Sequence, residues 1–379
     1  MNVNKERMLN EFYELIRIPC STGDEREVAD LLKKRLKKLG AQDVKEDDAG
    51  SKINGNAGNI IATFGATMEG LPTVAFTAHM DCVEPCAGIE PVLKDGVITS
   101  KGDTILGGDD KSGVAAILEG LRLMKENALP HGKIVIIFCV AEEGGLRGSR
   151  NIDTKLTQGI DFGYVMDSSG VPGKIINQAP GQNAIRVTMH GKRSHAGLAP
   201  EDGVNAIVMM GTALARLPYG RIDEETTANV GFIDGGIATN IVADKCSVKA
   251  EARSRDLAKL KQQTDAMKEA FMSVEKDFPG GKAEVEVEEI YQPYLVDENS
   301  LCIEVAKRAA KEAGLEPNVG ATGGGSDANN FNKHSFPAAV LATGMTKVHT
   351  PEECLLEEHL YQTGEWVYRI IEQLPHVQH

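Results

Sequence analysis

The spacing of hydrophobic positions predicts two amphipathic helices followed by buried strands. Apolar residues recur at helical spacing over residues 4–18 and again over 24–39, where Gly40 ends the pattern. Short runs rich in Val and Ile then predict strands at 59–64, 73–81, 133–143 and 162–167. An apolar helix is expected among them, at 113–127. Continuous apolar strands that alternate with helices are typical of a sheet covered on both faces, so this part of the chain predicts an α/β fold.

From about residue 180 the pattern changes to that of a smaller domain. The expected elements are a strand, a helix, two strands, a helix and a strand, at 184–191, 205–217, 228–233, 246–254, 256–278 and 283–291. This β-α-β-β-α-β order is that of the ferredoxin-like split βαβ unit. After Pro293 the earlier pattern returns, and it ends in a helix at 355–374. We therefore expect a discontinuous larger domain of residues 1–178 and 293–379, with a smaller domain of residues 179–292 inserted into it.

The charge and the apolar content argue against two classes of protein. The 379 residues carry 41 basic and 55 acidic side chains, which gives a net charge of -14 at pH 7. Proteins that bind nucleic acid normally present a positive field, so this balance predicts no nucleic-acid partner. No apolar run approaches the ~18 residues that span a bilayer, and the start of the chain lacks the apolar core of a signal peptide. We therefore expect no membrane partner and a cytoplasmic location.

The cysteines are consistent with that location. There are seven, they are scattered, and they form no CxxC pair. This usage is typical of reduced thiols in a cytoplasmic protein. Cys82 and Cys86 lie four residues apart, as in half of a metal site, but no second pair of thiols follows them. Thiolate zinc sites normally contain two such pairs, so we expect metal ligands of another kind.

Candidate chemistry lies where the predicted strands end. In the run at 73–81, the strand covers residues 73–78 and leads into His79 and Asp81, which are two residues apart, so both lie on the same face if the chain stays extended. Glu142 and Glu143 follow another strand, and Asp167 ends the next one. Open α/β sheets bind their ligands at the carboxyl ends of their strands. The sequence therefore predicts a cluster of acids and an imidazole at one edge of the sheet.

Two further segments add acids and a second imidazole. Asp109 and Asp110 precede an apolar helix, and His349 follows a strand predicted at 338–344. Each residue alone has a simpler explanation, because strand-end histidines, acidic helix caps and solvated loop acids are all common. Together they are the ligand types that suit Zn(II), Mn(II) or Co(II), and several acids suit two ions that share one carboxylate. Such a pair of ions activates a water and polarises a carbonyl group.

A set of short strings carries a family resemblance. TAHMD, GGDDKSG, AEEGG, YVMDSSG and KVHTPEE occur in this order and, with the inserted β-α-β-β-α-β unit, resemble the M20 family of di-zinc metallopeptidases. The resemblance covers essentially the whole chain and is strongest to the peptidase T, or tripeptide aminopeptidase, branch. It implies a zinc-peptidase-type mixed sheet flanked by helices, which forms the catalytic domain. It also implies that the inserted domain serves as a lid and in dimerisation.

The resemblance implies two sets of metal ligands. His79, Asp109 and Asp167 would hold one ion. Asp109, Glu143 and His349 would hold the other, which makes Asp109 the ligand shared by both. The implied cofactors are two divalent metal ions, with Zn(II) as the expected metal.

Two further acids receive roles from the same resemblance. Glu142 would be the general base that takes a proton from a water bridging the two ions and passes it to the leaving amine. Asp81 would orient the ring of His79. The shared ligand is placed at Asp109, not at the acid after it, because the family pattern reads D-x-K and Lys111 sets the register.

The inserted domain would supply contacts to the substrate. His195 and Arg253 alone are explained equally well as a loop histidine and a surface cation. The resemblance implies that His195 reaches the active site of the partner subunit and stabilises the oxyanion there. It also implies that Arg253, with Asn240, binds the C-terminal carboxylate of the peptide. A homodimer is expected through this domain, since an open sheet edge can pair with its copy across a two-fold axis.

The function predicted from these residues is that of a metal-dependent aminopeptidase, which hydrolyses the N-terminal peptide bond of tripeptides and other short peptides. The alternative is another amide hydrolase of the same fold, either a dipeptidase or an N-acyl-amino-acid deacylase, with the same metal site and a different pocket. A metal-binding or regulatory protein that keeps the fold without turnover would be expected to lack Glu142 or His195, and both are present.

Overall fold

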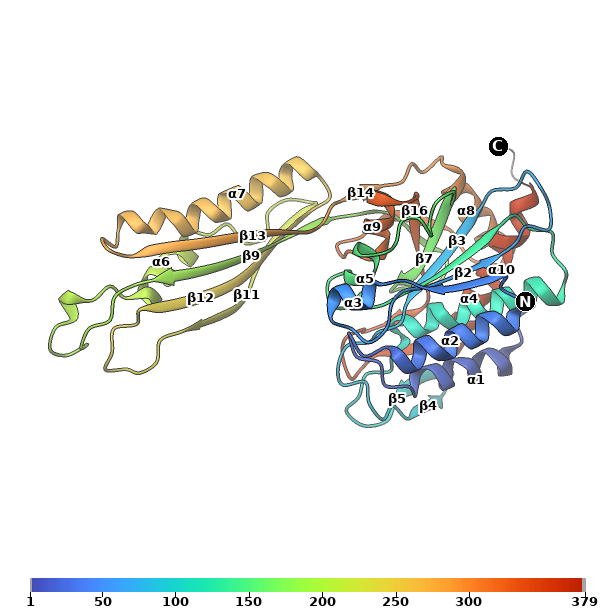
Figure 1. Cartoon of the computed structure of the whole chain (residues 1–379), viewed down its shortest axis with the longest axis horizontal. Helices are drawn as coiled ribbons and strands as arrows, with labels where there is room; N and C mark the ends of the chain where they lie inside the picture. The colour runs from blue at the N-terminus through green and yellow to red at the C-terminus, as the bar shows by residue number, and fades with distance from the viewer. Residues whose placement is uncertain (1, 377–379) are drawn as a thin grey trace. The chain divides into compact units, whose positions relative to one another are not determined.

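The computed structural model describes residues 2–376 and divides into two compact units. The larger unit contains the chain up to Gln178, Leu295–Thr322 and the chain from Ser326 onwards. The smaller unit contains Ala179–Tyr294 and Gly323–Gly325. Figure 1 gives the elements of both units. In the sequence, the smaller unit therefore interrupts the larger one.

The larger unit is built on a nine-stranded mixed sheet flanked by helices, which confirms the predicted α/β fold. The strands lie in the order β1 (Asp43–Glu46), β2 (Ile60–Phe64), β6 (Ile134–Cys139), β3 (Val74–His79), β7 (Phe162–Ser168), β16 (Ala338–Ala342), β8 (Lys174–Ala179) and β14 (Tyr294–Leu295), with β15 (Asn318–Ala321) paired to β8. Strands β6, β3, β7 and β16 are parallel neighbours at its centre. Every residue of β3 and β6 is buried, which explains their continuous apolar sequences.

The helices of the larger unit include those predicted from the apolar spacing. They are α1 (Lys5–Ile16), α2 (Arg26–Leu39), α3 (Ala49–Ile53), α4 (Gly108–Glu126), α5 (Arg147–Arg150), α8 (Leu301–Glu312), α9 (Asp327–His334) and α10 (Glu357–Gln373). Helix α4 packs against β3 and between α1 and α10. Gly40 ends α2 in the left-handed conformation, with a φ of 105°. Within residues 2–376, no helix combines the length and the apolar content needed to cross a membrane.

A second, four-stranded sheet in the larger unit was not predicted. Its strands lie in the order β17 (Met345–Thr346), β18 (Cys354–Leu356), β5 (Val97–Ser100) and β4 (Pro91–Lys94). These strands are short and partly exposed, so their sequences show no clear alternation. The pairing of β18 with β5 places the segment after His349 beside the segment that leads to α4.

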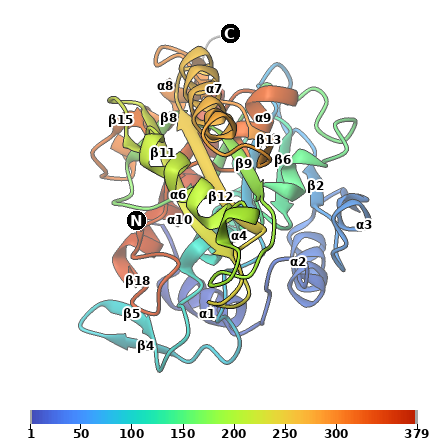
Figure 2. The ribbon, with the colours of Figure 1, turned by 90° about the vertical axis from the view of Figure 1, so that its left-hand side faces the viewer.

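The smaller unit has one antiparallel sheet with two helices. Its elements are β9 (Gly181–His190), α6 (Ala206–Arg216), β10 (Gly220–Arg221), β11 (Thr226–Gly235), β12 (Lys245–Ser254), α7 (Leu257–Ser273) and β13 (Lys282–Tyr291), in the sheet order β10-β11-β12-β9-β13. Both helices pack on the sheet and against each other, as Figures 1 and 2 show. Alternate residues of β9 (Ile185, Val187 and Met189) share its core with Met209 and Phe271. Short 3-10 helices complete the two units, at Pro200–Asp202, Val274–Lys276 and Leu374–His376.

Candidate metal centre

The central strands of the larger sheet bring the predicted strand-end residues to one edge. His79 is the last residue of β3 and pairs in register with Cys139, the last residue of β6. Glu142 and Glu143 therefore lie just beyond the end of β6. Asp167 lies near the end of β7, which is parallel to β3. The parallel order of these strands thus places the side chains at the same edge.

The structure brings the candidate ligands together in two groups that share one carboxylate. His79, Asp109 and Asp167 form one group, and Asp109, Glu143 and His349 form the other, with the ligand atoms of each group within 4.8 Å of one another. By the same criterion, Glu142 lies with His79 and Glu143 in a third group. Oδ1 of Asp109 lies 3.0 Å from Nε2 of His79, and its Oδ2 lies 3.3 Å from Nε2 of His349. The two oxygens of Asp109 thus face different imidazoles, the arrangement required of a ligand that bridges two ions.

The charge at this edge is strongly negative. Burial raises the pKa of Glu142 and of Asp167, and the charges of neighbouring acids raise both further. The adjacent carboxylates of Asp109 and Glu143 raise the pKa of His349 to about 10. Burial opposes the charged form of His79, but hydrogen bonds to the carboxylates around it outweigh this and raise its pKa. Excess negative charge of this kind is what a bound divalent cation would neutralise.

An unpartnered oxygen of Glu143 also indicates a site for a cation. Its Oε1 is buried and has no hydrogen-bond partner within residues 2–376, although it lies 2.9 Å from Nε2 of His349. Buried polar atoms normally have partners, and a bound cation would supply one for this oxygen. The donor set, imidazole nitrogens and carboxylate oxygens, fits a divalent metal such as Zn(II).

Buried side chains accept four consecutive backbone N–H groups of the turn that carries Glu142 and Glu143. The N–H groups of residues 140–143 donate in order to Oδ1 of Asn59 (3.1 Å), Oε1 of Glu25 (3.0 Å), Oδ1 of Asp81 (3.0 Å) and Oδ2 of Asp81 (3.2 Å). Asn59, Glu25 and Asp81 are all fully buried. The turn is therefore fixed by side chains from other segments, which limits the positions open to both acids.

Asp81 contacts His79 mainly through its backbone. Nδ1 of His79 lies 3.0 Å from the carbonyl oxygen of Asp81 and 3.5 Å from Oδ1. A ring nitrogen held in this way fixes the tautomer and leaves Nε2 of His79 to face Asp109. The carboxylate of Asp81 mainly accepts the N–H groups of the Glu142 turn and the hydroxyl of Thr22.

The buried Lys111 supports the neighbouring chain. Its Nζ donates to the carbonyl oxygen of Met80 and lies 3.1 Å from Sγ of Cys20 and 3.2 Å from Sγ of Cys82. Met80 lies between His79 and Asp81, so Lys111 ties the start of α4 to the end of β3. The sequence identified Lys111 only as a marker of register and did not predict this contact.

Asp109 and Asp110 have different surroundings. The carboxylate of Asp109 faces both imidazoles, as described above. The carboxylate of Asp110 is fully buried and accepts the backbone N–H groups of His79 and Gly113. Adjacent acids in the sequence therefore differ in what they can bind, and Asp109 is the one that faces the other ligands.

The candidate substrate residues lie in the smaller unit. His195 is exposed, and its Nδ1 accepts the N–H groups of Gly197 and Leu198. Asn240 is exposed, and its backbone carbonyl oxygen accepts the N–H of Ala196, the residue after His195. Arg253 lies on β12 and makes a two-point ion pair with Glu251, with N···O distances of 2.9 Å and 3.0 Å. The structure thus places His195 beside Asn240, and Arg253 separately on the sheet.

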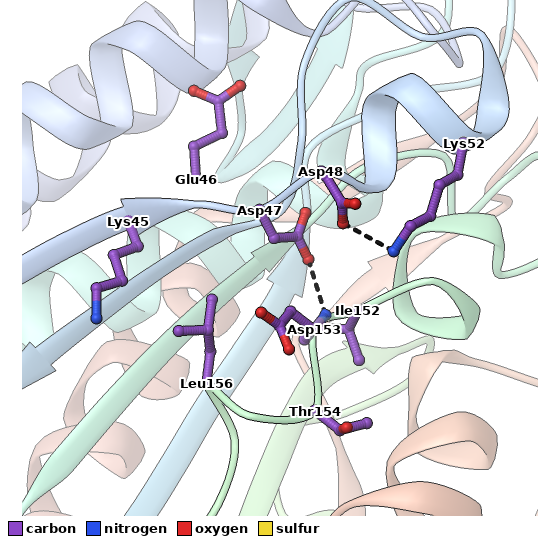
Figure 3. A pocket seen from close by; sticks show the side chains of 9 residues that line it. All are labelled: Lys45, Glu46, Asp47, Asp48, Lys52, Ile152, Asp153, Thr154 and Leu156. Atoms are coloured by element: carbon purple, nitrogen blue, oxygen red, sulfur yellow. Dashed lines mark hydrogen bonds and ion pairs between the residues drawn. The ribbon is translucent and has the colours of Figure 1, made fainter.

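A pocket in the larger unit involves none of the candidate ligands. It is a hollow of ≈ 650 Å³ lined by Lys45, Glu46, Asp47, Asp48, Lys52, Ile152, Asp153, Thr154 and Leu156 (Figure 3). Asp48 pairs with Lys52 at 2.7 Å, and Asp47 accepts the N–H of Asp153. Its other charged groups also have partners, since Glu46 pairs with Arg26 and Lys33, and Lys45 pairs with Asp43. We therefore assign it no function.

The chain matches a known peptidase family over most of its length. The model of peptidase family M20/M25/M40 matches residues 75–373. That range includes every candidate ligand, Glu142 and the three candidate substrate residues. The resemblance inferred from the short strings is therefore confirmed at the level of the family.

Relatives of similar length extend this finding. The chain is 42% identical over 371 residues to the protein YqjE of Bacillus subtilis, covering 98% of this chain and 99% of that one. The crystal structure of the aminopeptidase PepT from Bacillus cereus matches with a TM-score of 0.91 and 43% identity, covering 99% of this chain and 100% of the other. A tripeptidase from Staphylococcus aureus matches with a TM-score of 0.95 and 39% identity, covering 100% of both chains.

Proposed function

This chain belongs to peptidase family M20/M25/M40 and is a peptidase, and from this premise we propose that it is a two-metal aminopeptidase acting on tripeptides and other short peptides. The observation that supports this most is the sharing of Asp109 between two groups of ligands, with Glu142 beside them. The 43% and 39% identity to an aminopeptidase and a tripeptidase supports the substrate class.

The metal-holding residues of the proposal are those of the two groups. His79, Asp109 and Asp167 would hold one divalent ion, and Asp109, Glu143 and His349 the other, with Zn(II) as the proposed metal. Two such ions, when bound, polarise the carbonyl group of the scissile bond and lower the pKa of the water between them. The buried Asp81 keeps Nε2 of His79 directed at the site through the contact to Nδ1.

Glu142 is the proposed general base. Its carboxylate lies within 4.8 Å of ligand atoms of His79 and Glu143, and its backbone is held by Asp81. Burial raises the pKa of Glu142 well above its usual value, which makes its carboxylate a stronger base toward the proton of a water. It would accept the proton of the attacking water at one oxygen and pass it to the nitrogen of the leaving amine.

The smaller unit would bind the rest of the peptide. His195 would donate a hydrogen bond to the developing oxyanion from the partner subunit of a dimer. Arg253 and Asn240 would bind the C-terminal carboxylate. Glu251 takes two of the five N–H donors of the Arg253 guanidinium, so others remain for a carboxylate of the substrate.

The proposed homodimer is supported by the surface of the smaller unit. Ile207, Val208, Phe232 and Ile233 are large apolar residues on α6 and β11 that are 44–54% exposed. Within the described residues, β10 pairs with only the first part of β11, up to Ala228, which leaves the rest of that edge open. Apolar surface beside an open sheet edge favours pairing with a second copy. Light scattering tests this, and a monomeric mass at micromolar concentration would refute it.

The state of the cysteines supports the proposed cytoplasmic location. All seven are free thiols in the structure. Free thiols persist in reducing compartments. Fractionation of cells would locate the protein, and recovery outside the cytoplasm would contradict this part of the proposal.

A panel of peptides tests the activity and separates it from its alternatives. We expect fastest hydrolysis for unblocked tripeptides, release of the N-terminal amino acid, and no cleavage when the α-amino group is acetylated. Chromatography of the products at matched concentrations of di-, tri- and tetrapeptides measures this. Preference for dipeptides would indicate a dipeptidase, and preference for N-acetyl amino acids a deacylase. Either outcome would replace the substrate class and leave the metal site unchanged.

Replacing Arg253 with alanine is expected to raise KM for a free tripeptide about 10- to 150-fold, because hydrogen bonds between charged groups contribute ~1.5–3 kcal/mol. The same substitution should leave KM for the tripeptide amide unchanged, since the amide has no carboxylate. Arg186→Ala is the matched control, because Arg186 lies on the neighbouring strand β9, is exposed and pairs with Glu288. Equal losses on the free peptide and on its amide would contradict the role given to Arg253.

A further inference from the structure

Glu353 is a buried carboxylate that binds backbone N–H groups and has no ion-pair partner among the described residues. The residue is only 1% exposed. Oε2 accepts the N–H groups of Leu106 and Gly107, each at 2.9 Å, and Oε1 accepts the N–H of Asp109 at 3.0 Å. Both oxygens therefore bind one short turn, which is more than 240 residues away in the sequence.

The turn bound by Glu353 carries the shared ligand Asp109. Gly107 has a φ of 75° and provides no side chain to cap the helix that follows. The first N–H groups of a helix lack partners within it, so another group must bind them. A Cβ on Gly108 would lie 3.0 Å from Oε1 of Glu353, and the next atoms lie 3.8 Å away. Glycine at this position thus allows the carboxylate to approach the backbone closely.

Glu353 is also part of the turn that carries His349. Its own N–H donates to the carbonyl oxygen of Thr350, and β18 begins at the next residue. The hydroxyl of Thr350 donates to the carbonyl oxygen of Lys347, which closes the segment on the other side of His349. The side chain of Glu353 therefore joins the His349 turn directly to the Asp109 turn.

We propose that Glu353 is a positioning residue that sets the distance between Asp109 and His349, and thereby the affinity for the ion held by Asp109, Glu143 and His349. This inference rests on the proposed two-metal site. That group takes two of its three ligands from the turns that Glu353 joins. The group of His79, Asp109 and Asp167 takes only one. Loss of the contact should therefore weaken one ion more than the other.

Glu353→Gln is the most direct test. Glutamine keeps the size of the side chain, but both oxygens of Glu353 accept backbone N–H groups. The NH₂ group that replaces one of these oxygens is a donor, so it must face at least one N–H donor without a hydrogen bond. Calorimetric titration of chelator-treated protein with Zn(II) should show two ions for the wild type. In Glu353→Gln, we expect one affinity near that of the wild type and one lowered about 10- to 100-fold, the usual effect of residues that position a ligand. His349→Ala lacks one ligand of the ion held by Asp109, Glu143 and His349, so its titration identifies which of the two affinities belongs to that ion.

Two further variants make the result decisive. Glu365→Gln is the matched control, because Glu365 is 1% exposed on α10 and its carboxylate accepts the backbone N–H of Asn2. It should bind both ions with the affinities of the wild type. Gly108→Ala disturbs the same contact from the opposite side, so it should weaken the same ion and carries the test if Glu353→Gln does not fold.

The outcomes separate this inference from the function on which it rests. Unchanged affinities in Glu353→Gln, or in Gly108→Ala where only that variant folds, would overturn the role of Glu353. Equal weakening of both ions would also overturn it. A wild-type chain that binds no divalent ion would instead refute the proposed two-metal site.

Discussion

Replacing Glu142 with glutamine is expected to lower kcat about 10²- to 10⁴-fold, the usual contribution of a positioned general base. Glutamine has nearly the same shape but cannot accept and return a proton. The backbone N–H groups of residues 141 and 142 are held by buried side chains from other segments, so the substitution should leave the fold intact. Steady-state hydrolysis of a tripeptide measures the loss, and KM is expected to change little.

The neighbouring residue provides the control for this result. Glu143→Gln changes the same chemical group one position along, but Glu143 belongs to a proposed ligand group. We expect Glu142→Gln to retain two ions by elemental analysis and Glu143→Gln to lose one. A Glu142→Gln enzyme with the kcat of the wild type would refute the mechanism, and loss of metal from Glu142→Gln would make that residue a ligand.

Removing the metal ions is expected to abolish hydrolysis and to lower the Tm of the larger unit. Without cations, the neighbouring carboxylates of Asp109, Asp167 and Glu143 repel one another. An ion present at 100 times its Kd stabilises the folded state by about 2.7 kcal/mol. For a unit of this size that corresponds to a shift of about 5 to 10 °C per ion. Scanning calorimetry with a chelator and with added Zn(II) measures the shift.

The smaller unit and one variant act as internal controls for the metal effect. None of the candidate ligands lies in the smaller unit, so a transition that belongs to it should not move with metal. Asp109→Asn removes a charge from both ligand groups, and its Tm should depend much less on Zn(II). Identical Tm values for the wild type with and without metal, together with activity that survives chelation, would refute the proposed metal centre.

The central sheet and the cluster at its edge follow from local features of the sequence. Strands such as β3 and β6 are buried on both faces, so their sequences are continuously apolar and end abruptly at polar residues. The parallel order of such strands brings their carboxyl ends together, and His79 with Glu142 and Glu143 is found there. Strand identity and the position of the polar residue were enough to predict this cluster.

The supporting residues could not be predicted in this way. Glu352 and Glu353 are adjacent and chemically identical, yet Glu352 is exposed and pairs with Lys347, whereas Glu353 is buried against the Asp109 turn. Glu25 likewise lies in a polar segment and gave no signal of its contact with Ala141. Their partners are backbone N–H groups, which every residue except proline has, so no side-chain pattern marks them.

The sequence by itself determined the α/β fold of this protein, its family and the group of acids and imidazoles that could bind metal, because burial periodicity and residue chemistry are local properties. Only the tertiary structure decided which oxygen of Asp109 faces which imidazole, that the Asp110 carboxylate binds backbone N–H groups, and that Glu353 joins two ligand-bearing turns. These are contacts between segments far apart in the chain. They depend on how strands, turns and the small second sheet pack, and packing is a property of the whole unit.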